Sequence, residues 1–119
     1  QGRLDRALQF FESSRRRYAK MGMPHQSAIA EQEIADAYLE LNLIPEAAQI
    51  YQNVCRSFAE LELKSDKARA LAYYARASIE TGENEKAHQF LAEAREIYQE
   101  EKNPVGLGII KFIEAKLYF

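Results

Sequence analysis

The sequence has few of the residues that mark disulfide-rich, membrane or multidomain proteins. Of its 119 residues, one is cysteine, five are glycine, three are proline and none is tryptophan. The single Cys55 excludes an internal disulfide, and the scarcity of glycine and proline argues against a flexible linker or a second domain. No apolar run approaches the ~20 residues that a membrane span needs. The N-terminus has no hydrophobic signal-peptide core, so we expect a cytoplasmic protein without a membrane partner.

Charge of either sign is nearly balanced. Lysine and arginine number 16 against 18 acidic residues, for a formal net charge of −2. This balance gives no overall attraction to the phosphates of a nucleic acid, so we expect no nucleic-acid partner. The one run of like charge, Arg15-Arg16-Arg17, is predicted to be a solvated helix face because Glu12 and Ser13 lie nearby.

The residue types that build catalytic and metal sites are scattered. No histidine lies close enough in sequence to Cys55 to activate it, and Cys55 with His25 and His88 has no metal-ligand spacing. His88 aligns with inward-leaning positions, where a hydrogen-bonded structural histidine is the ordinary interpretation. Carboxylate pairs such as Glu31 and Glu33 fall on different helix faces. We therefore expect no enzyme, no cofactor and no metal.

An internal repeat is the strongest feature that is present. The segments that begin at Gly2, Asn42 and Gly82 resemble one another, and each continues to an alanine: Ala7, Ala47 and Ala87. These alanines are evenly spaced along the chain, since 47 − 7 = 40 and 87 − 47 = 40. A fixed period of this size indicates a repeat array. Glycine and asparagine tolerate the left-handed conformation that ends a helix, so each segment is predicted to be a tight turn between helices.

The apolar spacing between these turns is helical throughout. Ser65-Asp66, Asn84 and Asn103 are predicted to cap the starts of three helices. No segment has the alternation of a strand. The expected all-α fold has six antiparallel helices, at residues 4–20, 25–41, 45–63, 67–81, 84–101 and 104–119.

Small and large residues keep their places when the copies are aligned. Alanines recur in pairs such as Ala35 and Ala75, and aromatic residues recur as Tyr18, Phe58 and Tyr98. A small residue lets two helices approach closely, and a large one fills the adjacent space. The pattern therefore predicts helices packed side by side in a constant register.

These positions resemble the tetratricopeptide repeat over essentially the whole chain. The residues that carry the resemblance are Ala35, Tyr38, Asn42, Ala47, Tyr51 and Val54 in one repeat, and Ala75, Ser78, Gly82, Ala87, Leu91 and Ala94 in the next. Ser78 replaces an aromatic residue, Asn42 replaces glycine, and the period exceeds the commoner length of about 34 residues. The longer form is similar to repeats of kinesin light chains, cell-polarity scaffolds and bacterial peptide-sensing regulators. The phrases at 18–24 and 100–106 also resemble repeats of large bacterial proteins that carry a CHAT domain or a signalling ATPase.

The resemblance implies a right-handed α-solenoid and a non-enzymatic module that binds a protein or peptide. It divides a single domain, residues 1–119, into a half repeat at 1–23, repeats at 24–63 and 64–103, and a half repeat at 104–119. It also implies a concave groove lined by the first helix of each repeat, with arginines and a lysine for acidic groups and aromatic rings for apolar ones. The expected groove residues are Gln32, Asp36, Glu40, Arg69, Tyr73, Arg76, Glu80, Phe112 and Lys116.

Two other interpretations remain open at this stage. Asp36 and Arg76 could simply pair between adjacent helices, which is worth little at a surface. The last helix is apolar nearly all round, a pattern typical of a helix buried on more than one side. We therefore expect either a piece of a longer array or a scaffold that forms a homodimer through this helix.

Overall fold

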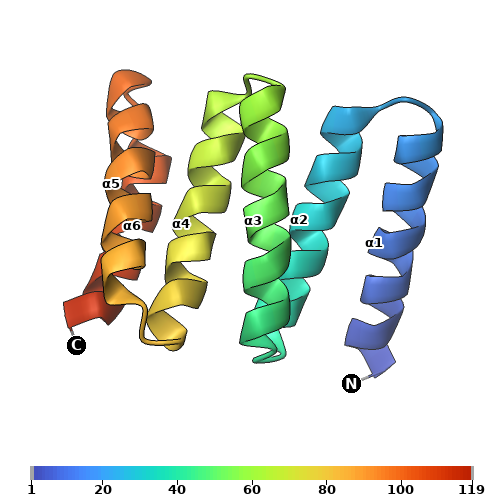
Figure 1. Cartoon of the computed structure of the whole chain (residues 1–119), viewed down its shortest axis with the longest axis horizontal. Coiled ribbons are helices and arrows are strands. Elements are labelled where there is room, and N and C mark those ends of the chain that lie inside the picture. Colours follow the sequence, from blue (N-terminus) through green and yellow to red (C-terminus); the bar gives the residue numbers. More distant parts are fainter. Residues whose placement is uncertain (1, 119) are drawn as a thin grey trace.

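The computed structural model describes residues 2–118, without the side chains of Leu4 and Tyr118. It contains six helices and no strand within those residues, which confirms the predicted fold class. Successive helices run antiparallel and lie side by side (Figure 1). Their bounds are α1 Gly2–Lys20, α2 Pro24–Glu40, α3 Ile44–Glu60, α4 Lys64–Glu80, α5 Asn84–Glu100 and α6 Pro104–Tyr118. The predicted chain ends, residues 1 and 119, lie outside the described residues.

The same left-handed turn joins every pair of successive helices. In each turn the residue after the left-handed one donates its N–H to the carbonyl five residues earlier, as Leu43 does to Tyr38 at 2.9 Å. This is the Schellman arrangement, and it satisfies carbonyls that a helix end would otherwise leave unpaired. Gly2, which we expected in such a turn, lies at the start of α1 instead. The left-handed residues are evenly spaced along the chain: Gly22 (φ 68°), Asn42 (63°), Glu62 (58°), Gly82 (81°) and Lys102 (53°).

The predicted side-chain caps are only partly present. Helix α4 begins at Lys64, earlier than expected, and its N-cap residue Leu63 makes no side-chain cap bond. Ser65 and Asp66 therefore lie inside the first turn, and Asp66 faces His25 of α2, with 3.0 Å between its Oδ2 and His25 Nε2. Asn84 is likewise inside α5, whose uncapped N-cap residue is Glu83. The cap at Asn103 is confirmed, because its Oδ1 accepts the N–H of Gly106 at 3.0 Å.

The even-numbered helices form a row of their own. Each helix packs against its neighbours in sequence, and in addition α2 contacts α4 and α4 contacts α6. Helices α1, α3 and α5 make no such contacts with one another within the described residues. The even helices therefore lie closer to one another than the odd helices do.

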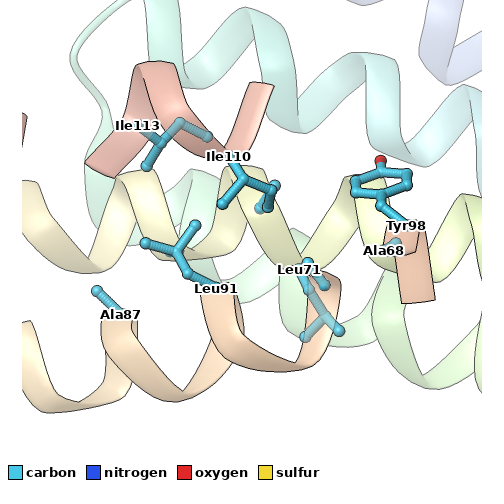
Figure 2. Close-up of a cluster of buried hydrophobic side chains, with 10 residues drawn as sticks. Ala68, Leu71, Ala87, Leu91, Tyr98, Ile110 and Ile113 are labelled. Carbon is cyan, nitrogen blue, oxygen red and sulfur yellow. The ribbon is translucent and has the colours of Figure 1, made fainter. Parts of the chain in front are cut away.

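The aligned columns occupy equivalent places in the core at α3 and α5, whereas Ala7 and Tyr18 of α1 are only partly buried. Ala47 and Ala87 are both fully buried, and Phe58 and Tyr98 are no more than 3% exposed. In the cluster between α4, α5 and α6, Leu71 and Leu91 lie with Ile110 and Ile113, and the small residues Ala68 and Ala87 leave room for them (Figure 2). The period of the sequence is thus a period of packing as well.

Candidate binding surface

The expected groove residues lie on three successive even helices. Helix α2 carries three of them, α4 carries four and α6 carries two. Gln32 is buried, while Asp36, Arg69, Tyr73 and Arg76 are half-buried. The exposed members of the set are Glu40, Glu80, Phe112 and Lys116.

Asp36 connects α2 to both of its neighbours. Its Oδ1 accepts a hydrogen bond from the Tyr51 hydroxyl of α3 at 2.5 Å, and its Oδ2 lies 3.0 Å from Nη2 of Arg69 on α4. Tyr51 is fully buried. Burial, followed by the nearby charge of Asp36 and the hydrogen bond to it, raises the pKa of Tyr51, so the hydroxyl remains a donor. The sequence did not indicate that Tyr51 belongs to this surface, because the equivalent positions of the other repeats are apolar and typical of a core.

Asp36 pairs with Arg69 and not with Arg76, so the alternative interpretation of a pair between Asp36 and Arg76 is wrong. Arg69, two helical turns before Arg76 on α4, is the residue that reaches Asp36. Equivalent residues of adjacent helices are therefore not level with one another, and a flat alignment of repeats cannot show that stagger. Burial by itself lowers the pKa of Arg69, but the charge of Asp36 and the hydrogen bond to it leave that pKa raised overall.

Aromatic rings support the arginine. The Arg69 guanidinium lies 4.4 Å from the centre of the Tyr73 ring, within the range of a cation–π contact. The Tyr73 ring in turn stacks against Tyr51, with 6.4 Å between ring centres and 20° between their planes. Asp36, Tyr51, Arg69 and Tyr73 therefore form one connected polar and aromatic cluster across α2, α3 and α4.

Several polar atoms on this side are buried without a partner among the described residues. They are Gln32 Oε1, Arg69 Nη1 and Arg76 Nε. An unpaired buried polar group costs about 1–3 kcal/mol, so a ligand or water that supplied partners would be stabilised there. No ion pair holds Arg76 within the part of the chain that the structure describes.

A hollow of about 300 Å³ lies where α4 meets α6. Tyr73 and Arg76 line it from α4, and Ile109, Phe112 and Ile113 line it from α6, together with Val105 and Gly108. The walls are mostly apolar with one guanidinium at the edge, which suits an apolar group next to an acidic one. The structure thus brings together three expected residues, Tyr73, Arg76 and Phe112, in this hollow.

The remaining expected residues are not gathered into it. Lys116 lies over the Phe112 ring, with its Nζ 5.6 Å from the ring centre, and so stays at the margin. Glu40 and Glu80 are exposed near the ends of their helices and do not line the hollow. Val105, Gly108 and Ile113 were not among the residues predicted for the groove, because an apolar helix face gives no signal of its own.

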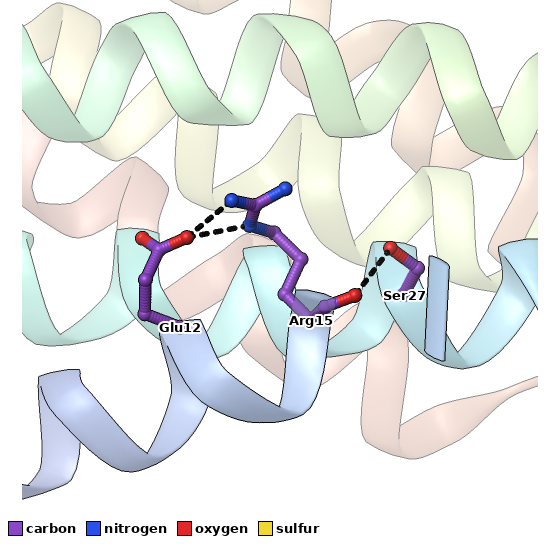
Figure 3. Close-up of polar contacts among 3 residues, drawn as sticks. All are labelled: Glu12, Arg15 and Ser27. Atoms are coloured by element: carbon purple, nitrogen blue, oxygen red, sulfur yellow. Dashed lines mark hydrogen bonds and ion pairs between the residues drawn. The ribbon is translucent and has the colours of Figure 1, made fainter. Parts of the chain in front are cut away.

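The arginine run of α1 is divided between two surroundings. Arg15 pairs with Glu12 one turn earlier, and Ser27 of α2 donates to the backbone carbonyl of Arg15 at 3.4 Å (Figure 3). Arg16 and Arg17 are exposed, as expected of a solvated face. Arg15 therefore serves the contact between α1 and α2.

Nucleophilic and metal-binding groups remain dispersed in space. Burial raises the pKa of the Cys55 thiol to about 12, with smaller opposing effects of Lys67 and Glu93. His88, which was expected to lean inward, is exposed on α5. Across residues 2–118, no group of three His, Cys, Asp or Glu side chains could hold a metal ion.

No described helix is long and apolar enough to cross a bilayer. The chain matches no family model, no curated protein and no solved structure.

Proposed function

We propose that this chain is a tetratricopeptide-type protein-binding module, without an activity of its own, whose even-helix face takes an extended peptide. The observation that carries the proposal is the unpaired Nε of Arg76 at the edge of the apolar hollow between α4 and α6. Arginine is the side chain best suited to hold a carboxylate with directed hydrogen bonds.

The ligand we propose is an acidic peptide with a large apolar side chain close to its carboxylate. The carboxylate would pair with Arg76, and the apolar side chain would enter the hollow beside Tyr73 and Phe112. Arg69 is already neutralised by Asp36, so it orients the Tyr73 ring rather than supplying a free charge. The proposal thus assigns different roles to the two arginines of α4.

Selection from a random peptide library displayed on phage tests the proposal. Peptides that combine aspartate or glutamate with leucine, phenylalanine or tryptophan should be enriched. Their affinity should fall by at least tenfold in Arg76→Glu, because a charge-assisted pair worth about 1.5–3 kcal/mol becomes a repulsion.

Arg56→Glu is the matched control for charge. Arg56 is exposed on α3, in the odd row, so the same reversal there should leave the affinity unchanged. Enrichment of basic peptides would contradict the proposal, as would equal binding by the Arg76→Glu and wild-type proteins.

A further inference from the structure

One face of α6 is apolar and open to solvent. Val105 is 75% exposed and Phe112 is 64% exposed, and Gly108 and Ala115 lie on the same side of the helix. Their spacing of three, four and three residues places all four in one stripe. Helix α6 packs only against α5 and α4 within the described residues. Tyr73 and Arg76 of α4 border this stripe across the hollow, but Val105 and Phe112 remain largely exposed.

The corresponding face of each earlier even helix is covered by the odd helix that follows it. Ala35 of α2 shares a core cluster with Ala47 and Tyr51 of α3. Ala75 of α4 shares a cluster with Ala87 and Leu91 of α5. The counterparts of Gly108, Phe112 and Ala115 in the two earlier repeats are all buried: Ala68 and Ala28, Ala72 and Gln32, Ala75 and Ala35. The open stripe of α6 is therefore a helix-pairing face.

Helix α1 carries the complementary face, which α2 covers only in part. Phe10 is 66% exposed, whereas its counterpart Phe90 stacks on Tyr74 of α4 with 4.3 Å between ring centres. The pairing residues of α1 are all partly exposed: Ala7, Phe11, Ser14 and Tyr18. Their counterparts on α3 and α5 are no more than 3% exposed: Ala47, Tyr51, Val54 and Phe58, and Ala87, Leu91, Ala94 and Tyr98.

The two faces are also in register. Helix α3 begins at residue 44 and α5 at residue 84, so the helix that pairs with α6 would begin near position 84 + 40 = 124. In a second copy the equivalent position is residue 4, which is three repeat periods earlier, since 3 × 40 = 120 and 4 + 120 = 124. Within one chain the ring centres of Phe58 and His25 are 6.3 Å apart. In this register Tyr18 takes the place of Phe58, and Val105 takes the place of His25. Tyr18 of the second copy would thus contact Val105.

A cation–ring contact of the earlier repeat has a charged counterpart in the same register. Lys86 of α5 lies over the Tyr74 ring of α4, with its Nζ 5.5 Å from the ring centre. The counterparts of these two residues are Arg6 on α1 and Glu114 on α6. Glu114 already pairs with Arg95 of α5, so Arg6 of a second copy would join an existing ion pair and add little to the association.

We propose that the protein associates head to tail with a second copy, with α1 of one copy packed on α6 of the other. This contact repeats the way α3 packs on α2 and α5 on α4. It joins two different surfaces, so each added copy leaves one α1 and one α6 free, and growth is open-ended. The stripe shares Val105, Gly108 and Phe112 with the hollow beside Arg76, so a second copy and a peptide would compete for this part of α6. Sedimentation of the protein without peptide tests the association separately from peptide binding.

Sedimentation velocity of two end-blocked variants, alone and mixed, tests the proposal. Gly108→Arg blocks α6 without straining the monomer, because no atom lies within 4 Å of a Cβ at this position. Phe10→Glu blocks α1 at an exposed position. The wild-type protein should grow beyond a dimer as its concentration rises, and each variant alone should remain a monomer. An equimolar mixture of the two should form a dimer and nothing larger.

The other outcomes overturn the proposal. A wild-type protein that remains monomeric at every concentration does so, as does a mixture that forms no dimer. Self-association of Phe10→Glu would show that α6 packs on α6 instead. Gln89→Arg, at an exposed position of α5, is the control and should assemble like the wild type. Phe112→Glu and Arg6→Glu provide a second block at each end if circular dichroism shows that a first variant is unfolded.

Discussion

At the scale of single residues, backbone conformation constrains this chain most strongly at its five turns. Glu62 and Lys102 hold φ values of 58° and 53°, in the left-handed region that costs a residue with a Cβ about 1–2 kcal/mol. Gly22 and Gly82 hold the equivalent conformation without that cost. Two of the turns are therefore strained by the residue type that occupies them.

Glu62→Gly should therefore stabilise the protein. We expect the free energy of unfolding to rise by about 0.5–1 kcal/mol, measured by urea denaturation, since relief of strain outweighs the added flexibility of the unfolded chain. Glu60→Gly, at the last residue of α3, should have the opposite effect because glycine weakens a helix. A loss of stability in Glu62→Gly would contradict the left-handed turn.

Gly106 has a different reason to be glycine. A Cβ at this position would lie 2.3 Å from Cδ1 of Tyr98, whose ring is 3% exposed and cannot move away freely. Gly106→Ala should lower the free energy of unfolding by about 1–3 kcal/mol, as overpacking does. Gly108→Ala on the same helix meets no atom within 4 Å and should raise it by up to about 1 kcal/mol. Equal effects of the two changes on thermal unfolding would refute this contact.

Glu31 gives the stability a dependence on pH. Burial raises the pKa of Glu31, the nearby Arg15 lowers it, and Glu12 raises it, so the folded pKa is above the unfolded one. The folded state then binds the proton more tightly, and the contribution of Glu31 to stability is lost as pH rises through its folded pKa. Glu31→Gln should therefore unfold at a higher temperature than the wild type at neutral pH. The difference should shrink on acidification, and a difference that grew would contradict this sign.

At the scale of helices, small residues decide how closely neighbours approach. Ala75 of α4 is fully buried against α5, whereas its counterpart Ala115 on α6 is exposed. Ala75→Leu should cost about 1–3 kcal/mol in the free energy of unfolding, because the added atoms force the helices apart. Ala115→Leu should be nearly neutral in the monomer, and comparison of the two by chemical denaturation checks this.

The helices were largely predictable from the sequence, but the start of α4 and two of the turns were not. Asn42 and Gly82 indicated left-handed turns by residue type, whereas Glu62 and Lys102 adopt the same conformation with no such signal. Ser65 and Asp66 suggested a cap, yet α4 begins one turn earlier, after Leu63. Here the regular spacing of the turns prevailed over local capping preference.

The sequence predicted the candidate site only as sets of equivalent positions in the aligned repeats. Alignment of repeats identified the helix face that carries Asp36, Tyr73 and Arg76, because equivalent residues of even helices point the same way. It could not show that Arg69 rather than Arg76 reaches Asp36, since the stagger between helices depends on packing. It also could not show the bond from Tyr51, which crosses from an odd helix to an even one.

At the scale of the whole molecule, stability should be distributed unevenly along the row of helices. Helix α4 contacts α2, α3, α5 and α6 and has eight buried residues, whereas α5 has four. In an array held together by contacts between neighbours, the members with most neighbours open least often. Within the described residues α1 contacts α2 alone, and α6 contacts α4 and α5 but leaves one face exposed, so these two end helices should open first.

Residue-resolved amide hydrogen exchange of the monomeric Gly108→Arg protein tests this account of the fold most directly. We expect the slowest exchange in α4, faster exchange in α1 and α6, and a break in protection at each of the five turns. Uniform protection across all six helices, as in a bundle that unfolds as one unit, would contradict it, as would an α4 no slower than α1.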